Sequence, residues 1–161
     1  MLATAGMQAD TATLHKVLQA RLQSYEHQHR KQMSVTAIAQ LLSTLLYYKR
    51  FFPYYTFNVL GGIDEEGKGC CFSYDAVGSF ERTIYSSSGT GQGLIQPLLD
   101  NQLGWKNQAP KAALSLEDTK ALVRDAFTSA GERDIYTGDS VEMYVIDSTG
   151  VHVESFPLKK D

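Results

Sequence analysis

The chain has 161 residues, of which 43% are hydrophobic and 20% are charged, so its composition is that of a folded globular domain and excludes a disordered chain. Its formal net charge of −3 means that the chain has no excess of positive charge, which argues against a nucleic-acid partner. No apolar run approaches the ~20 residues that cross a bilayer, and the first residues lack the pattern of a secretory signal. We therefore expect one domain over residues 1–161, without a membrane span, in the cytoplasm and nucleus.

Two helices open the predicted fold. Apolar residues recur at three- and four-residue steps over residues 11–32 and again after Ser34, which predicts two amphipathic helices. Ser34 is suited to cap the second helix, which should end near Arg50 because Pro53 lacks the helical donor. The apolar stripe of this second helix is wide enough to be largely buried.

Three short strands are predicted next. Aromatic and β-branched residues, separated by turn-rich loops, favour an antiparallel meander at residues 54–60, 70–74 and 80–85. Cys70 and Cys71 are adjacent, so their side chains point to opposite faces of the middle strand and are poorly placed to bridge or to share a metal. We interpret both thiols as reduced core residues.

The second half of the chain predicts two more helices and a hairpin. One helix is expected over residues 94–103, with Pro97 near its first turn, and another begins after Ser115 as its cap. Strand-like residues 140–146 and 151–156 then close the chain with a hairpin. The resulting order, ααβββααββ, favours an α+β layered domain over a parallel, doubly wound sheet.

The chemically active side chains form no metal or phosphate motif. His27 and His29 diverge by roughly 200° on a helix, and His15 and His152 are isolated, so we predict no metal and no cofactor. The glycine-rich residues 89–93 lack the Lys and Ser or Thr that complete a phosphate loop, and are interpreted as a strand-to-helix connection.

The segment 132–139 is the most informative stretch, with four charges, a hydroxyl and a glycine directly after a predicted helix. From the residues alone we interpret it as a helix C-terminus, with Arg133 near the last carbonyl groups and Gly138 turning the chain into the next strand.

The same segment resembles the pattern that ends the third helix of proteasome β subunits. Further similar motifs, which resemble the beta type-1 class of these subunits, lie at residues 49–55, 61–69, 74–79, 96–102 and 159–161. The resemblance runs from about Gly6 to Asp161 and implies an N-terminal-nucleophile hydrolase fold, an αββα sandwich of two antiparallel sheets between helical layers. It also implies that the opening strands of that sandwich are absent from this chain.

The resemblance implies a partial catalytic apparatus. In active relatives an N-terminal threonine attacks the peptide carbonyl, and its own α-amino group is the base. The supporting positions fall on Thr90, Asp134 and Thr137, followed by Gly138, whereas Asp139 stands where the active pattern has glycine. The nucleophile and its aspartate and lysine have no counterpart in these residues. The resemblance thus implies vestigial supporting positions, with no catalytic residue, cofactor or metal.

We therefore predict an N-terminally shortened, non-catalytic β subunit of the proteasome core that completes the ring enclosing the chamber for ubiquitin-dependent and other intracellular protein degradation. The implied partners are the other β subunits of the ring and the α subunits of the adjacent ring. One alternative is a free-standing serine/threonine hydrolase that uses residues 86–90, from Ser86 to Thr90, with His15 or His152. Another alternative is a peptide-binding module that no longer assembles.

Overall fold

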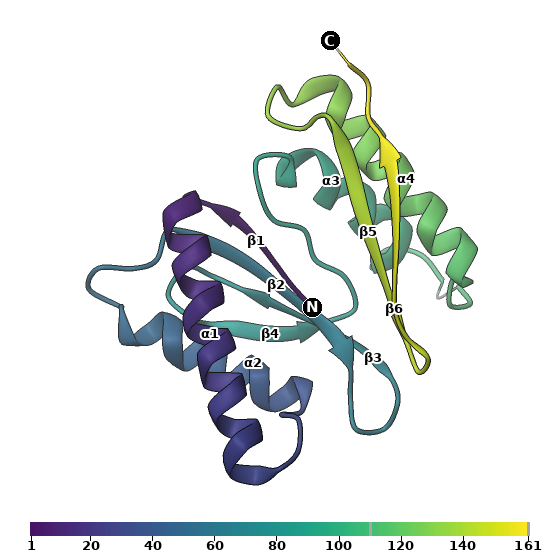
Figure 1. Ribbon diagram of the computed structural model, residues 1–161. Coiled ribbons are helices and arrows are strands. Elements are labelled where there is room, and N and C mark those ends of the chain that lie inside the picture. The colour runs from purple at the N-terminus through teal and green to yellow at the C-terminus, as the bar shows by residue number, and fades with distance from the viewer. Residues whose placement is uncertain (110, 161) are drawn as a thin grey trace. The chain divides into compact units, whose positions relative to one another are not determined.

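The structure, a computed structural model, describes residues 1–109 and 111–160 and divides into two compact units (Figure 1). The first unit comprises Met1–Gly89 and Ile146–Gly150, and the second comprises Thr90–Val145 and the residues from Val151 onward. Pro110, and Asp161 of the closing motif at residues 159–161, lie outside the described residues. None of the helices in the described part is long and apolar enough to cross a membrane.

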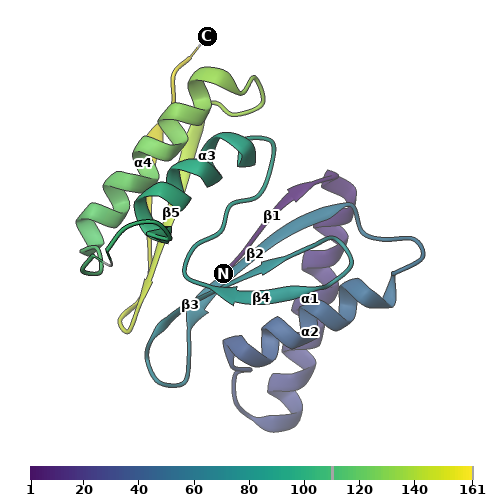
Figure 2. The same cartoon turned by 180° about the vertical axis from the view of Figure 1, so that it is seen from behind.

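The first unit is an antiparallel sheet with two helices on one face (Figures 1 and 2). The strand order follows the chain, β1-β2-β3-β4, and each neighbouring pair is antiparallel. The elements are β1 (Leu2–Gly6), α1 (Gln8–His29), α2 (Val35–Tyr48), β2 (Thr56–Ile63), β3 (Gly69–Tyr74) and β4 (Phe80–Thr83). The predicted meander of three strands is therefore confirmed, with ends that differ by a few residues.

The sequence interpretation missed strand β1. This strand pairs with β2 along its whole length, from Leu2 opposite Leu60 to Gly6 opposite Thr56. Most of its residues are small, so it carries little of the aromatic and β-branched signal that predicts a strand. Its partner residues lie fifty or more positions away in the chain, and only the tertiary fold brings the two strands together.

For the two helices of the first unit, the predicted cap is confirmed, whereas the predicted ends differ by a few residues. Ser34 accepts a hydrogen bond from the Ala37 amide at 3.2 Å, which confirms the predicted cap of α2. Helix α1 starts three residues earlier than expected, at Gln8, and stops at His29, because Arg30 adopts a left-handed backbone with φ of 54°.

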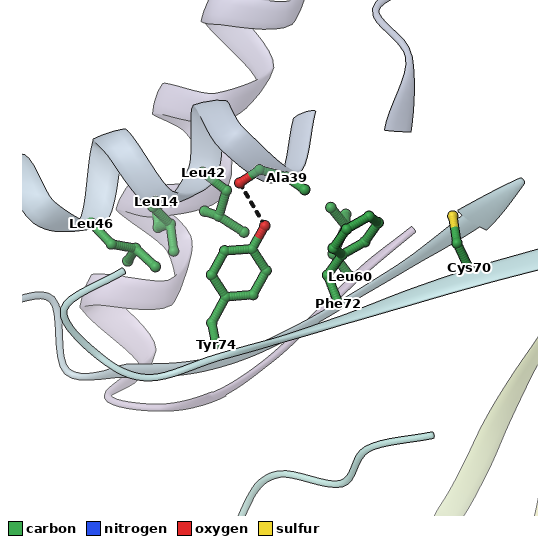
Figure 3. Packing of buried hydrophobic residues seen from close by; sticks show 8 residues of the cluster. All are labelled: Leu14, Ala39, Leu42, Leu46, Leu60, Cys70, Phe72 and Tyr74. Atoms are coloured by element: carbon green, nitrogen blue, oxygen red, sulfur yellow. Dashed lines mark hydrogen bonds between the residues drawn. The ribbon is translucent and has the colours of Figure 1, made fainter. Parts of the chain in front are cut away.

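A hydrophobic core lies between these helices and the sheet (Figure 3). Cys70 is part of this core, as expected. The expectation that Cys71 is also a core residue is wrong, because the alternation along β3 points it to the opposite face, where it is half-buried. Tyr74 points from β3 toward α2 and donates a hydrogen bond of 2.7 Å to the Ala39 carbonyl oxygen. The buried members of the core are Leu14, Ala39, Leu42, Leu46, Leu60, Cys70, Phe72 and Tyr74.

The second unit packs helices α3 and α4 against a two-stranded sheet (Figures 1 and 2). The predicted closing hairpin is confirmed, and so is the cap of α4, because Ser115 Oγ accepts a hydrogen bond of 3.1 Å from the Asp118 amide. The elements are α3 (Gln92–Leu99), a π-helical turn η1 (Asp100–Gly104), α4 (Leu116–Arg133), β5 (Ser140–Asp147) and β6 (Gly150–Pro157).

The expectation that Pro97 lies near the first turn of its helix is wrong. Because α3 begins at Gln92, Pro97 is an interior residue that supplies no backbone donor. The helix continues only to Leu99, and the backbone then widens into η1. The antiparallel sheets and the four α-helices of the described residues confirm the predicted fold class, α+β.

Candidate functional site

The described structure gathers three of the predicted supporting residues at one place in the second unit. Thr90 lies two residues before α3, Asp134 follows the last residue of α4, and Thr137 lies in the turn that leads to β5. Asp134 leaves the helix with an extended backbone, while its amide still donates to the Ala130 carbonyl oxygen at 2.8 Å. This departure directs the Asp134 side chain at the residues that precede α3.

The Asp134 carboxylate accepts hydrogen bonds from the hydroxyl groups of Thr90 and Thr137. Thr90 Oγ1 donates to Asp134 Oδ2 at 2.6 Å, and Thr137 Oγ1 donates to the same oxygen at 2.7 Å. The other oxygen, Oδ1, accepts the Tyr136 amide at 3.2 Å. The carboxylate therefore joins the start of α3 to the end of α4, which are 44 residues apart in the chain. We call Thr90, Asp134 and Thr137 the carboxylate–hydroxyl cluster.

These hydrogen bonds also set the charge of the cluster. The Thr90 hydroxyl and then the Thr137 hydroxyl lower the pKa of Asp134 below its ordinary value. Burial opposes them, and the Tyr136 amide adds the smallest effect, which also lowers the pKa. The carboxylate is therefore ionised at neutral pH. A carboxylate with a lowered pKa has little tendency to take up a proton, so it is a poor base for either hydroxyl.

The sequence interpretation did not single out Gly91, which packs against the cluster. A methyl group at this position would lie 3.4 Å from Thr137 Oγ1, 3.5 Å from the Ala130 side chain and 3.6 Å from Asp134 Oδ2. These are ordinary van der Waals distances, so Gly91 lies directly beside the cluster and an alanine would also fit there. The available signal was its place within the glycine-rich residues 89–93.

Gly138 does not have the turn role expected from the residues alone. Its φ lies outside the left-handed region, and a methyl group there would meet nothing within 4 Å. Asp139 takes the left-handed conformation instead, with φ of 59°, and its carbonyl oxygen accepts the Leu158 amide at 2.9 Å. Asp and Asn adopt this conformation more readily than most residues, so aspartate can replace the expected glycine.

His15 and His29 have local partners. His29 stacks on Tyr25 one helical turn away, with ring centroids 4.3 Å apart, and His15 Nε2 lies 3.1 Å from Thr4 Oγ1. Within residues 1–109 and 111–160, no group of three or more His, Cys, Asp or Glu side chains is arranged to hold a metal ion.

Ser86 and Thr90, at the two ends of the loop proposed for the alternative hydrolase, each donate a hydrogen bond to an oxygen atom. Ser86 Oγ donates to Ser73 Oγ at 2.9 Å, while Thr90 donates to Asp134 within the carboxylate–hydroxyl cluster. His15 Nε2 lies 3.1 Å from Thr4 Oγ1. The Ser86 and His15 contacts therefore join each of these side chains to a hydroxyl group rather than to one another.

Comparison with known proteins identifies the family. The family model described as "Proteasome subunit" matches residues 1–146. The chain belongs to the proteasome subunit family. It is 58% identical to proteasome subunit beta type-1 of Oryza sativa and 56% identical to that of Dictyostelium discoideum, over 99% and 100% of this chain respectively. The Petunia hybrida subunit of the same name is 54% identical over 100% of the chain.

These similarities confirm the predicted resemblance to the beta type-1 class and the proteasome β-subunit fold. The chain spans 75%, 70% and 75% of the lengths of the three relatives, in the order given above. Thr90, Asp134 and Thr137, which the resemblance predicts at the supporting positions, are brought together by the described contacts of the carboxylate–hydroxyl cluster.

Proposed function

We propose that this proteasome subunit is a non-catalytic, structural β subunit that completes the β ring of the core particle. The observation that carries the proposal is the double hydrogen bond at Asp134, because one oxygen of its carboxylate holds the hydroxyl groups of both Thr90 and Thr137. These groups hold one another in place, and the described contacts direct neither hydroxyl toward an activating base.

Chemical catalysis by this cluster would need a group that removes a proton from a hydroxyl. A general base works best when its pKa lies near the operating pH, and the pKa of Asp134 is lowered by the hydroxyl and amide donors around it. The carboxylate is therefore a strong hydrogen-bond acceptor and a weak base. This supports Thr90, Asp134 and Thr137 as vestigial supporting positions with a structural role. We propose the following Gly138 as a vestigial position only because the resemblance implies it.

That structural role follows from what the cluster connects. A charged acceptor shared by two donors from distant segments fixes the relative position of α3 and α4 more tightly than a neutral contact would. Ala130 and Gly91 pack beside it, so the joint combines close packing with hydrogen bonds. We propose that the cluster keeps these two helices in the geometry that assembly requires.

The proposed partners are the other β subunits of the ring and the α subunits of the adjacent ring. Membership of a family whose proteins are named as proteasome subunits supports assembly with such partners. The activity of the particle would then be intracellular protein degradation, in the cytoplasm and nucleus, with this chain forming part of the chamber wall. We further propose that residues 1–161 act in it as one β-type domain.

Two measurements on the purified chain test this function. We expect no hydrolysis of fluorogenic peptides above the buffer rate, and no change in intact mass after treatment with a threonine-directed electrophile. Co-expression with the other core subunits should place the chain in particles of core size. Stoichiometric labelling at Thr90, Thr137 or a serine of residues 86–90 would contradict the proposal and favour the alternative hydrolase. The matched control is the Thr90→Val variant, which cannot be labelled at that position.

A further inference from the structure

An exposed cluster of aromatic side chains spans the end of helix α2 and the loop after it. Residues 47–55 connect the last turn of α2 to β2, and this segment projects at the edge of the first unit (Figure 1). Phe51 is 98% exposed, Tyr48 90% and Phe52 83%, and Tyr47 and Tyr55 are also more than half exposed. Single exposed apolar residues are ordinary on protein surfaces, but five large aromatic side chains within nine residues form a concentrated patch. We call this segment the 47–55 patch.

The backbone of the 47–55 patch is held by hydrogen bonds on both sides. On the helix side, the Arg50 amide donates to the Tyr47 carbonyl oxygen at 2.9 Å. On the strand side, the Tyr55 amide donates to Asp10 Oδ2 at 2.8 Å, and its carbonyl oxygen accepts the Met7 amide at 2.9 Å. The aromatic side chains are therefore presented from an anchored backbone, which lowers the entropy lost when a partner binds.

Two cations lie among these aromatic rings. Lys49 Nζ is 4.8 Å from the centroid of the Tyr54 ring, and the Arg50 guanidinium carbon is 5.9 Å from that of Phe51. Neither cation has a carboxylate partner among residues 1–109 and 111–160. The patch thus carries two uncompensated positive charges on a chain whose formal net charge is −3.

We infer that the 47–55 patch is a docking surface for another proteasome subunit, which contributes a carboxylate bordered by apolar side chains. The inference rests on the proposed function, since it assigns a surface to the partners proposed there. Aromatic residues and arginine dominate the energetically important centres of protein interfaces, and a carboxylate from the partner would complement both cations. The acidic balance of the whole chain favours a protein partner over a nucleic acid.

The first test maps the contact by photo-crosslinking. Phe51 is replaced by the photo-reactive residue p-benzoylphenylalanine, the chain is co-expressed with the other core subunits, and the assembled particles are irradiated. We expect a crosslink to a peptide of another subunit that contains Asp or Glu. The same residue introduced at Ile84, which is 88% exposed in the same unit but outside the patch, is the matched control and should not label that peptide.

The second test measures the charge requirement. The Arg50→Glu variant should be incorporated into particles about tenfold less than the wild-type chain at equal expression. Lys31→Glu makes the same charge change at an exposed position outside the patch, so incorporation should be unchanged. Both variants should melt like the wild-type chain, which excludes misfolding as the cause. Changing the crosslinked carboxylate of the partner to lysine should restore incorporation of the Arg50→Glu variant.

The outcomes separate this inference from the proposed function. If the wild-type chain is not incorporated at all, both are overturned. If it is incorporated but Arg50→Glu enters particles equally well, or the Phe51 probe labels no other subunit, only the docking inference is overturned. A crosslink solely to a second copy of this chain, or binding of a single-stranded oligothymidine that Arg50→Glu abolishes, would also overturn it.

Discussion

The substitution Leu42→Ala tests whether the helix–sheet core stabilises the whole chain. Leu42 lies on α2 with an exposed fraction of 0%, within the core that α1 and α2 form with β2 and β3. Each lost methylene-sized group costs about 0.8 kcal/mol, which gives about 2.5 kcal/mol for the isopropyl group. The cavity that remains raises the expected loss of unfolding free energy to about 3–4 kcal/mol. This is a large fraction of the ~5–15 kcal/mol that stabilises a typical domain.

Urea unfolding monitored by amide hydrogen exchange measures this loss residue by residue. If residues 1–161 fold as one domain, the most protected amides of α4 and β5 should lose protection together with those of β2 and β3. Leu94→Ala, at a position that is 43% exposed, is the control and should cost less than about 1 kcal/mol. A loss below about 1 kcal/mol for Leu42→Ala would refute the core argument. Loss of protection confined to the first unit would refute the single domain.

Three further predictions concern single side chains. Because the pKa of Asp134 is lowered in the folded chain, its contribution to stability should be present above the ordinary carboxyl pKa and be lost as the pH falls through the lower folded-state value. An NMR titration of this carboxyl group should have its midpoint below 3.8. The Asp134→Asn variant should lack this acid-dependent loss of stability. Gly78→Ala should lower the free energy of unfolding in urea far more than Gly67→Ala. Both glycines have positive φ, but only a methyl group at Gly78 would lie 2.5 Å from a carbonyl oxygen of a helix. Equal losses for the two variants would contradict this. Tyr74→Phe should cost about 1 kcal/mol through the lost hydrogen bond to α2, and an unchanged urea midpoint would show that this bond contributes nothing.

Much of the secondary structure was predictable because its signals are local. Ser34 and Ser115 precede apolar periodic segments, and each accepts the expected hydrogen bond from an amide three residues later. The strands β3 and β4 are bounded by turn residues, so their positions could also be predicted. Strand β1 could not, because its short, small-residue sequence becomes a strand only through pairing with β2.

The candidate site was predictable only in part. The resemblance to proteasome β subunits indicated Thr90, Asp134 and Thr137, but the sharing of one carboxylate oxygen between two hydroxyl groups depends on how α3 and α4 pack. The left-handed backbone of Asp139 was missed for a different reason. Glycine is the usual residue for that conformation, so the adjacent Gly138 was the expected turn residue.

The most direct test of the central claim is an intact-mass measurement on this chain inside assembled core particles that have been treated with a threonine-directed electrophile. We predict that the chain co-purifies stoichiometrically with the other subunits and keeps its unmodified mass, while peptide hydrolysis by the active subunits of the same particles is inhibited. A covalent adduct on this chain would contradict its non-catalytic role. Its absence from the particles would contradict its role as a structural β subunit.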